Sequence, residues 1–444
     1  MMVRRLLRLL VVTVPVAVFA PHCLAQAKEQ YIPLPVYKTG PVSAVGTGMY
    51  GGVIDYFDYV NKKYGGVNGV KLVWEECETA FQVDRAVECY ERLKRKGSTG
   101  ALHFMTYQTG AIYALTDRAR ADKIPLVLFN SGRADASDGR VFPYSFPIGT
   151  NYLSANTAKI RFIGAQEGGM EKLKGKKFVN LYIGNAYGKE TIPLLEIQAK
   201  RYGFEVTHIE VPIPGTEQQA QWLQIRRIQP DWVILRLAGV QVPAALKMAQ
   251  RMGFPASKML GVASAGSEED VIPAGDAAIG FTAWALGPSG RHFPVVKEMY
   301  DLLYTGGKHG NMEDPNRVGS VYYNAGVING ILTVEAMRIG QAKFGKRPLT
   351  GEEIQWAYER LKLDDKRLKA LGAENLLAPV RLSCADHEGG SPARFHRWDG
   401  KKWNPVGDWV PTDRALVRQW VEGSAAKYAK EKGITPRDCA KEGA

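Results

Sequence analysis

Short apolar segments alternate with longer amphipathic segments along most of this chain, and the series occurs twice. The first series runs through "GVKLVWEE", "QVDRAVECYERLKRKG", "GALHFM", "TGAIYALTDRARADK" and "IPLVLFN". The second begins after "SFPIGTNY" and contains the strand-like segments "KFVNLYIG", "EVTHIEVPI", "DWVILRL" and "KMLGVAS". Strands separated by helices are typical of parallel sheets with helices packed between the strands. The sequence therefore predicts an α/β protein of two lobes, each a doubly wound parallel sheet.

The remaining segments suggest how the chain is divided between the lobes. We expect lobe 1 to contain residues 28–150 and about 281–378, and lobe 2 to contain 151–280 and about 379–410. Several strands would then form the hinge between them, and "DAAIGFTAWAL" is expected to be a strand that crosses back toward lobe 1. The charged segment "RALVRQWVEGSAAKYAKEKG" predicts that residues 411–444 form a helical C-terminal extension.

The first 27 residues have the pattern of an export signal. Three arginines precede the apolar run "LLVVTVPVAVFA", and the small-x-small stretch Ala25-Gln26-Ala27 follows. We therefore expect cleavage after about Ala27 and a periplasmic location. A retained membrane anchor is the alternative, and "APH" before Cys23 disfavours a lipoprotein. No later segment approaches 18 uninterrupted apolar residues, the length expected of a membrane span.

Four cysteines follow the expected signal: Cys77, Cys89, Cys384 and Cys439. An even number in an exported chain permits disulfides, with three possible connectivities. Cys77 ends a strand-like segment and Cys89 lies in the next helical one, so we favour the pairs Cys77–Cys89 and Cys384–Cys439. Free buried thiols are the alternative. The chain has no C-x-x-C, which leaves metal or redox chemistry with little support.

The net charge of the chain is +13, from 58 basic and 45 acidic residues. No Lys/Arg block or stripe of basic and aromatic residues stands out, so we expect no nucleic-acid partner. The excess charge could equally favour anionic ligands or an anionic membrane surface.

A glycine-rich stretch, "VGTGMYGG", contains G-x-G-x-x-G at Gly46, Gly48 and Gly51. In a dinucleotide-binding turn these glycines directly follow a strand, but here "TGPVSAV" intervenes. We therefore predict no cofactor, and interpret the stretch as a tight loop that forms one lip of a ligand cleft together with Val45.

The evidence for a catalytic motif is as weak as that for a dinucleotide-binding turn. There is no H-E-x-x-H, and "VASAG" around Ser264 lacks the first glycine of G-x-S-x-G. We expect no enzyme and no metal site; a secreted α/β enzyme is kept as an alternative.

Several segments, in their order and spacing, resemble one known family. They are "TGPVSAVGTGMYGGVIDYFDYVNKKYGGVNG", Thr109-Gly110 with "AIYALTDRARADKIPLV", "LYIGNAYGKE" and "PVRLSCADHEG". Over about residues 28–410 the chain resembles the leucine/isoleucine/valine-binding proteins of ABC transporters. The resemblance implies a type I periplasmic binding protein, a monomer whose lobes close on a small ligand and which docks on membrane permease subunits. A domain that presents its ligand to a membrane receptor is the alternative.

The resemblance also implies where the ligand lies. In amino-acid-binding relatives, one wall holds the α-carboxylate with segments that match "TYQTGA" and "NSGRADA", and Arg133 adds a candidate carboxylate partner. The opposite wall carries a tyrosine, matched by Tyr187, and Arg236 adds positive charge there. The predicted ligand-binding residues are Val45, Tyr107, Gln108, Thr109, Gly110, Asn130, Arg133, Tyr187, Arg236 and Ser264.

One expected anchor is missing. The acidic residue that neutralises an α-ammonium should fall at Ala263 or Ser264, and Glu268 or Glu269 could replace it only in a rearranged loop. An unpaired ammonium in the cleft would cost several kcal/mol, by the ~2–7 kcal/mol scale for burying polar groups. We therefore expect an organic acid, aromatic acids included, rather than a branched-chain amino acid or an amide.

Overall fold

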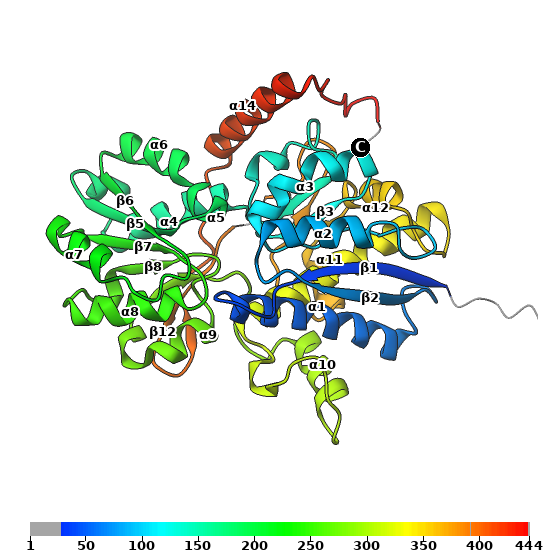
Figure 1. The fold of residues 1–444 in the computed structure, drawn as a ribbon, viewed down its shortest axis with the longest axis horizontal. Coiled ribbons are helices and arrows are strands. Elements are labelled where there is room, and N and C mark those ends of the chain that lie inside the picture. The colour runs from blue at the N-terminus through cyan, green and yellow to red at the C-terminus, as the bar shows by residue number, and fades with distance from the viewer. Residues whose placement is uncertain (1–27, 391, 443–444) are drawn as a thin grey trace, which may run out of the picture.

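The computed structural model describes residues 28–390 and 392–442, which form two α/β lobes lying side by side (Figure 1). The predicted signal, with its cleavage site after Ala27, lies outside the described residues. Both lobes have helices on both faces of a sheet, as the alternating segments predicted. In the described part of the chain, no helix is long and apolar enough to cross a membrane.

Lobe 1 is built on parallel strand pairs. The pairs are β1 (Glu29–Val36) with β2 (Lys71–Glu78), and β3 (Leu126–Phe129) with β4 (Ser145–Ile148). The segment 101–105 connects the two pairs, because the Leu102 N–H donates to Tyr31 and the Phe104 N–H donates to Pro125. The predicted strand "GALHFM" therefore lies at the centre of the lobe 1 sheet.

In the described part of the chain, seven α-helices complete lobe 1. They are α1 (Ser43–Tyr64), α2 (Val83–Leu93), α3 (Thr109–Asp122), α10 (Pro294–Tyr304), α11 (Val321–Phe344), α12 (Gly351–Tyr358) and α13 (Asp365–Ala370). α1 and α11 pack closely because glycines face each other. A Cβ at Gly52 would collide with the Tyr323 carbonyl, and one at Gly326 with the Met49 carbonyl.

The glycine-rich stretch differs from its predicted form. Gly46, Gly48 and Gly51 lie in the first turns of α1 and not in a tight loop. A Cβ at Gly46 would collide with Tyr37, and a Cβ at Gly51 with Met312. The glycines therefore allow close packing of α1, which physically explains the spacing without a bound phosphate.

Lobe 2 has one sheet of seven strands in the order β13-β12-β9-β8-β7-β5-β6. Its strands are β5 (Lys177–Ile183), β6 (Glu205–Val211), β7 (Trp232–Arg236), β8 (Met259–Gly261), β9 (Thr282–Trp284), β12 (Phe395–Trp398) and β13 (Trp403–Pro405). β5 to β9 are parallel, whereas β12 is antiparallel to both β9 and β13, so the sheet is mixed. Its helices are α4 (Tyr152–Gln166), α5 (Ala186–Lys189), α6 (Ile192–Tyr202), α7 (Gln219–Ile228), α8 (Gln241–Arg251) and α9 (Glu268–Val271).

Two segments, β9 and the segment around β11, do not lie in the lobe that we expected for them. β9 extends the lobe 2 sheet beside β8, so residues from about 281 do not yet belong to lobe 1. β11 (Val380–Arg381) pairs with β10 (Lys362–Leu363), and the following His387 N–H donates to the Ser137 carbonyl of lobe 1. The crossovers between the lobes thus occur later in the chain than the composition suggested.

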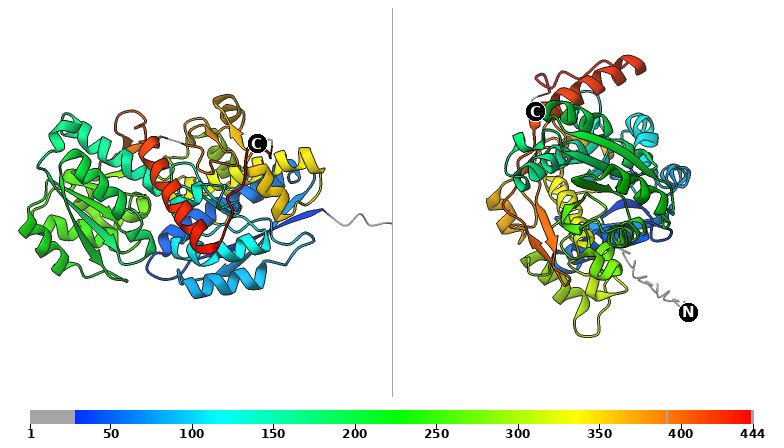
Figure 2. Two further views of the ribbon diagram at one scale, coloured as in Figure 1. Left: turned by 90° about the horizontal axis from the view of Figure 1, so that it is seen from above. Right: turned by 90° about the vertical axis from the view of Figure 1, so that its left-hand side faces the viewer.

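The C-terminal extension contains one long helix, α14 (Arg414–Lys432), which lies across both lobes (Figures 1 and 2). Val417 and Val421 pack on Leu153 and Leu194 of lobe 2. Further along, α14 contacts lobe 1, where Tyr428 and Lys432 bond to Asp117.

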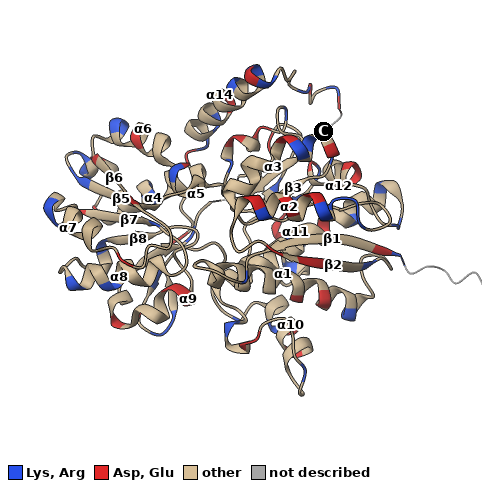
Figure 3. Cartoon of the chain, in the orientation of Figure 1, with Lys and Arg blue, Asp and Glu red and all other residues tan. Residues whose placement is uncertain are grey.

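Both predicted disulfides are confirmed. Cys77 pairs with Cys89 inside lobe 1, and Cys384 pairs with Cys439. The second bridge fastens the segment after α14 to the segment that follows β11. Lys/Arg and Asp/Glu residues are interspersed over both lobes (Figure 3).

Candidate functional site

The lobes touch where loops at the carboxyl ends of their parallel strands face each other. The Val240 N–H of lobe 2 donates to the Pro41 carbonyl of lobe 1 at 3.0 Å. The Ala134 N–H of lobe 1 donates to Glu190 Oε1 of lobe 2 at 2.8 Å. Ligands of open α/β sheets bind at these strand ends, and the contacts show that the lobes are closed.

An acidic segment of lobe 2 holds the start of α11 in lobe 1. Glu268 accepts the Val321 N–H at 2.9 Å, and Glu269 pairs with Arg317 at 2.9 Å. The Tyr322 hydroxyl donates to buried Asp270 at 2.5 Å. Carboxylates are stabilised by the positive end of a helix dipole, so this segment acts as a latch between the lobes. Glu268 and Glu269 are therefore occupied and do not anchor a ligand in this closed state.

Arg236 lies at the centre of the interface, at the end of β7, and is 1% exposed. Its guanidinium lies between the rings of Tyr152 and Tyr187, at 4.5 and 4.3 Å from their centroids. Nε donates to the Tyr187 carbonyl at 2.7 Å, but buried Nη2 has no hydrogen-bond partner. Among the described residues, no carboxylate lies within ion-pair distance of this cation. Arg236 is thus a buried donor that remains available to an anionic group.

A second cation lies near it. Lys159, on α4, is also 1% exposed, and no ion pair of Lys159 occurs in the described structure. Burial, with a smaller effect of Arg236, holds the pKa of Lys159 well below its usual range. A buried guanidinium and a buried amine without a carboxylate partner are costly, which makes this region electrostatically suited to an anion.

Glu190 of lobe 2 is an acidic group close enough to Arg236 to be affected by its charge. Burial raises the pKa of Glu190 to about 7, while Arg236 and the Ala134 N–H oppose that rise. Part of the Glu190 stem reaches solvent, but Oε2 is buried without a hydrogen-bond partner. Gly132 of lobe 1 lies against this oxygen and Thr109, where any side chain would collide. The interface therefore contains an unpaired acceptor as well as unpaired donors.

Tyrosines form the lobe 1 side of the interface between the lobes. Tyr37 is buried near Tyr152 and Tyr187 of lobe 2, and its hydroxyl donates to the Tyr107 carbonyl at 3.4 Å. Tyr107 packs edge-on against Tyr50, with ring centroids 5.0 Å apart. Burial raises the pKa of each of these phenols, so they act as neutral hydrogen-bonding rings.

The structure brings several of the predicted residues together. Thr109 of lobe 1 lies beside Tyr152 of lobe 2, whose ring packs against Tyr187 and Arg236, and Ser264 lies beside Tyr187. Tyr107 lies on the lobe 1 side, where its carbonyl accepts from Tyr37.

The other predicted residues have structural contacts. Gln108 donates to the Phe81 carbonyl, Asn130 to the Leu286 carbonyl, and Val45 is buried in α1. Gly110 lies against Val83.

Arg133 has neighbours different from those we expected. Its guanidinium lies 4.6–4.8 Å from the ring centroids of Tyr113, Phe142 and Tyr428, and Nε lies 3.4 Å from Asp135. The guanidinium of Arg133 faces α14, because Tyr428 on that helix is the third of the rings that surround it.

Residues missed by the sequence reasoning are Tyr37, Tyr152, Lys159, Glu190, Asp270 and Tyr322. Tyr152 follows a strand, and Glu190 closes the quoted segment "LYIGNAYGKE", so position after a strand was an available signal for both. Nothing in the local sequence marks Lys159 as buried.

One group of residues has the proximity of a metal site. Ligand atoms of Glu359, Cys384 and Glu442 lie within 4.8 Å of one another. However, Cys384 is in a disulfide, and both carboxylates pair with Arg437. This group is therefore a structural anchor for the C-terminus.

The comparison with known proteins identifies one family that matches this chain. The family model described as "Periplasmic binding protein" matches residues 29–402. A crystal structure named "abc transporter permease from pseudomonas fluorescens group" is 45% identical, with 93% of this chain and 100% of that chain covered and a TM-score of 0.86. No curated protein sequence matches this chain.

Two more distant structures share the fold. A branched-chain amino acid ABC transporter protein from Thermus thermophilus with bound valine is 21% identical, covering 88% of this chain and 98% of that chain, with a TM-score of 0.74. An ABC transporter solute-binding protein from R. palustris in complex with benzoate is 19% identical, covering 87% and 97%, with a TM-score of 0.66.

Proposed function

The chain belongs to the periplasmic binding protein family, and we propose that it binds a small organic acid between its lobes and delivers it to an ABC importer. In this proposal the ligand carboxylate is held at Arg236, and closure of the lobes presents the loaded protein to membrane permease subunits. The protein acts as a binder and not as an enzyme.

The observation that carries the proposal is the unpaired guanidinium of Arg236. A fully buried cation with a free Nη2 needs a partner of opposite charge. Lys159 adds a second buried basic group nearby, which would gain a proton more readily beside a bound anion. A ligand carboxylate would accept from Nη2 and offset part of the cost of burying both groups, because charge-assisted hydrogen bonds are the stronger kind.

The rings around Arg236 favour a planar organic acid. Tyr152 and Tyr187 already enclose the guanidinium, and Tyr37 lies near both. Aromatic walls that stack on a ring, with a cation for its carboxylate, suit an aromatic acid. The R. palustris relative with bound benzoate has the same fold and supports this ligand class.

A zwitterionic amino acid is the second candidate, because Glu190 offers an acceptor that the sequence did not reveal. Its Oε2 is buried without a partner beside Gly132 and Thr109. An α-ammonium there, with the carboxylate at Arg236, would satisfy both groups. The Thermus thermophilus relative with bound valine has the corresponding fold.

Calorimetric titration separates the two candidates. We expect benzoate and other monocyclic carboxylates to bind wild-type protein at the interface, and Arg236→Met to abolish that binding, with exposed Arg226→Met on α7 as the matched control. Glu190→Gln should leave an organic acid bound but remove an amino acid. Binding of amino acids alone, lost in Glu190→Gln, would reject the organic acid in favour of the zwitterion.

The remaining assignments complete the proposal. We place the mature protein in the periplasm after cleavage near Ala27, as a monomer. A sensing role differs only in the partner that recognises the closed lobes, and co-purification with permease subunits rather than with a receptor distinguishes the two.

A further inference from the structure

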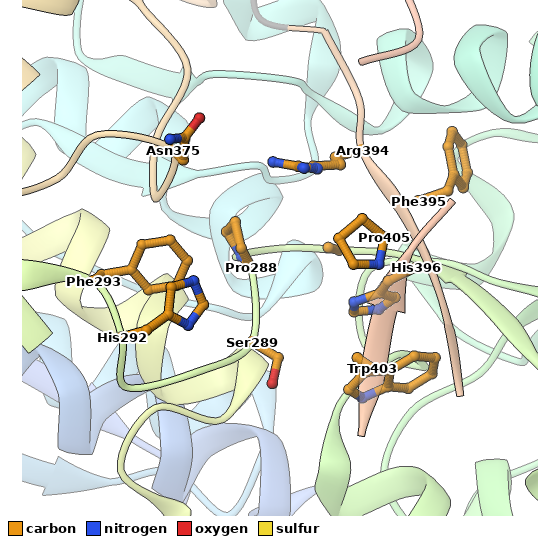
Figure 4. Close-up of a pocket in the computed structure, with 11 residues that line it drawn as sticks. Pro288, Ser289, His292, Phe293, Asn375, Arg394, Phe395, His396, Trp403 and Pro405 are labelled. Carbon is orange, nitrogen blue, oxygen red and sulfur yellow. The ribbon is translucent and has the colours of Figure 1, made fainter. Parts of the chain in front are cut away.

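A cavity of about 360 Å³ lies beside the segments that cross between the lobes (Figure 4). We call it the hinge pocket. Its lobe 1 wall contains Ser289, His292 and Phe293 at the start of α10, and its lobe 2 wall contains His396 and Trp403 on β12 and β13. It has the size of a small-molecule site, and none of the residues around Arg236 lines it.

The charge of the hinge pocket comes from one residue. Arg394 is the only lysine or arginine in its lining, and no aspartate or glutamate lines it. The guanidinium extends across the pocket toward Asn375 (Figure 4). Buried Nε has no hydrogen-bond partner, and the described structure gives Arg394 no ion pair. The guanidinium lies 5.4 Å from the centroid of the Trp409 ring, so a bound anion would meet a cation that has an aromatic neighbour but no acidic partner.

Two pairs of rings form opposite sides of the cavity. His292 and Phe293 lie with centroids 4.1 Å apart, and His396 stacks on Trp403 at 3.9 Å (Figure 4). Trp403 is 6% exposed, and its buried Nε1 has no hydrogen-bond partner. Burial lowers the pKa of His396 to about 3, so its ring is neutral and available for stacking. The walls suit a flat ring.

Both lobes are needed to form the pocket. Ser289, in its lining, donates its hydroxyl to Glu268 of the latch. Opening the lobes would separate the His292–Phe293 pair, which directly precedes α10, from the ring pair on β12 and β13. A ligand here therefore binds the closed arrangement in preference to the open one, which is the condition for a population shift.

From these observations we propose that the hinge pocket is a second binding site, for a small aromatic carboxylate whose acid group pairs with Arg394 and whose ring lies between the two ring pairs. This site is separate from the one at Arg236 and does not depend on what the interface binds.

The test uses benzoate as the probe and Arg236→Met as the background, because that variant removes the interface site. We expect titration of the variant to show one molecule of benzoate per chain, with a Kd below about 1 mM. Adding Arg394→Met should weaken the remaining binding at least tenfold, whereas adding exposed Arg251→Met, on α8, should not change it.

A second measurement locates the probe. Benzoate should shift the indole N–H resonance of Trp403, assigned by its loss in Trp403→Phe, in the Arg236→Met background. An absence of binding in that background, or binding that Arg394→Met leaves unchanged, would overturn the second site. Loss of benzoate binding in Arg236→Met alone leaves the interface proposal intact, so the two proposals fail separately.

Discussion

Two arginines without acidic partners occupy opposite surroundings in this protein. Arg236 is fully enclosed by tyrosines in the closed interface, whereas Arg394 lines a cavity of about 360 Å³. An enclosed cation cannot be solvated in place of a missing partner, but a cation beside an open pocket can be. An anion beside Arg236 would thus stabilise its surroundings more than an anion beside Arg394 would.

The largest expected effect separates these two arginines directly. Arg236→Met should weaken binding of an acid at the interface by about 100-fold or more, because loss of a buried charge partner costs ~2–5 kcal/mol. Arg394→Met should change that affinity less than about fivefold, since residue 394 is outside the interface. Calorimetric titration measures both affinities. Equal losses of interface affinity in the two variants would show that Arg236 and Arg394 do not serve separate sites.

The cost of burying cations predicts a stability effect at Lys159. Lys159→Met keeps a side chain of similar length and removes the buried amine, so the free energy of unfolding should rise by about 1 kcal/mol or more.

The pH dependence of that effect follows from the lowered pKa of Lys159. The folded state binds fewer protons there than the unfolded state, so wild-type stability should gain on the variant as pH rises toward about 10.5. Denaturant unfolding across pH measures this, with exposed Lys200→Met as control. A wild type that equals the variant at every pH would contradict it.

The latch gives an intermediate effect on ligand affinity. Tyr322→Phe removes the hydroxyl that donates to Asp270, at a cost of about 1 kcal/mol. Because this contact joins the two lobes, affinity at the interface should fall about fivefold. Tyr300→Phe on α10 is the control, and unchanged affinity in Tyr322→Phe would show that the latch does not contribute to closure.

The smallest effect concerns Glu190, whose pKa is raised to about 7. A raised carboxyl pKa means that its stabilising contribution is full below about pH 4.5 and is lost as pH rises through 7. Glu190→Gln should therefore match wild type near pH 5 and melt a few degrees higher near pH 8. Thermal melts at the two pH values check this. A Tm difference independent of pH would contradict the prediction that Glu190 loses its proton as the pH rises through 7.

The sequence allowed the two sheets and both disulfides to be predicted, and it placed Thr109, Tyr187 and Arg236 near strand ends that face each other in the structure. These features depend on local pattern, or on the rule that the ends of parallel strands meet at one edge. β9 was assigned to the wrong lobe because a three-residue strand carries too little pattern to show which sheet it joins.

Other parts of the site depend on distant residues. Lys159 is buried because lobe 2 packs around α4, and charged side chains are seldom fully buried without a partner. Arg133 faces α14 because Tyr428, 295 positions later, completes its enclosure (133 to 428). Contacts formed by the C-terminal extension could not be inferred from a resemblance that ended near residue 410.

Because Cys384 and Cys439 form a disulfide, the way in which α14 is attached depends on the compartment in which the chain folds. In an oxidising compartment, the end of the chain is covalently fastened to lobe 1, while the start of α14 remains on lobe 2. In a reducing cytoplasm the bridge does not persist, and noncovalent contacts would hold that end, among them the pair of Arg437 with Glu359 and the bonds of Tyr428 and Lys432 to Asp117. Protein recovered from such a compartment would keep both sheets but lack this covalent link, so the oxidation state of these two sulfurs reports the redox conditions in which the chain folded.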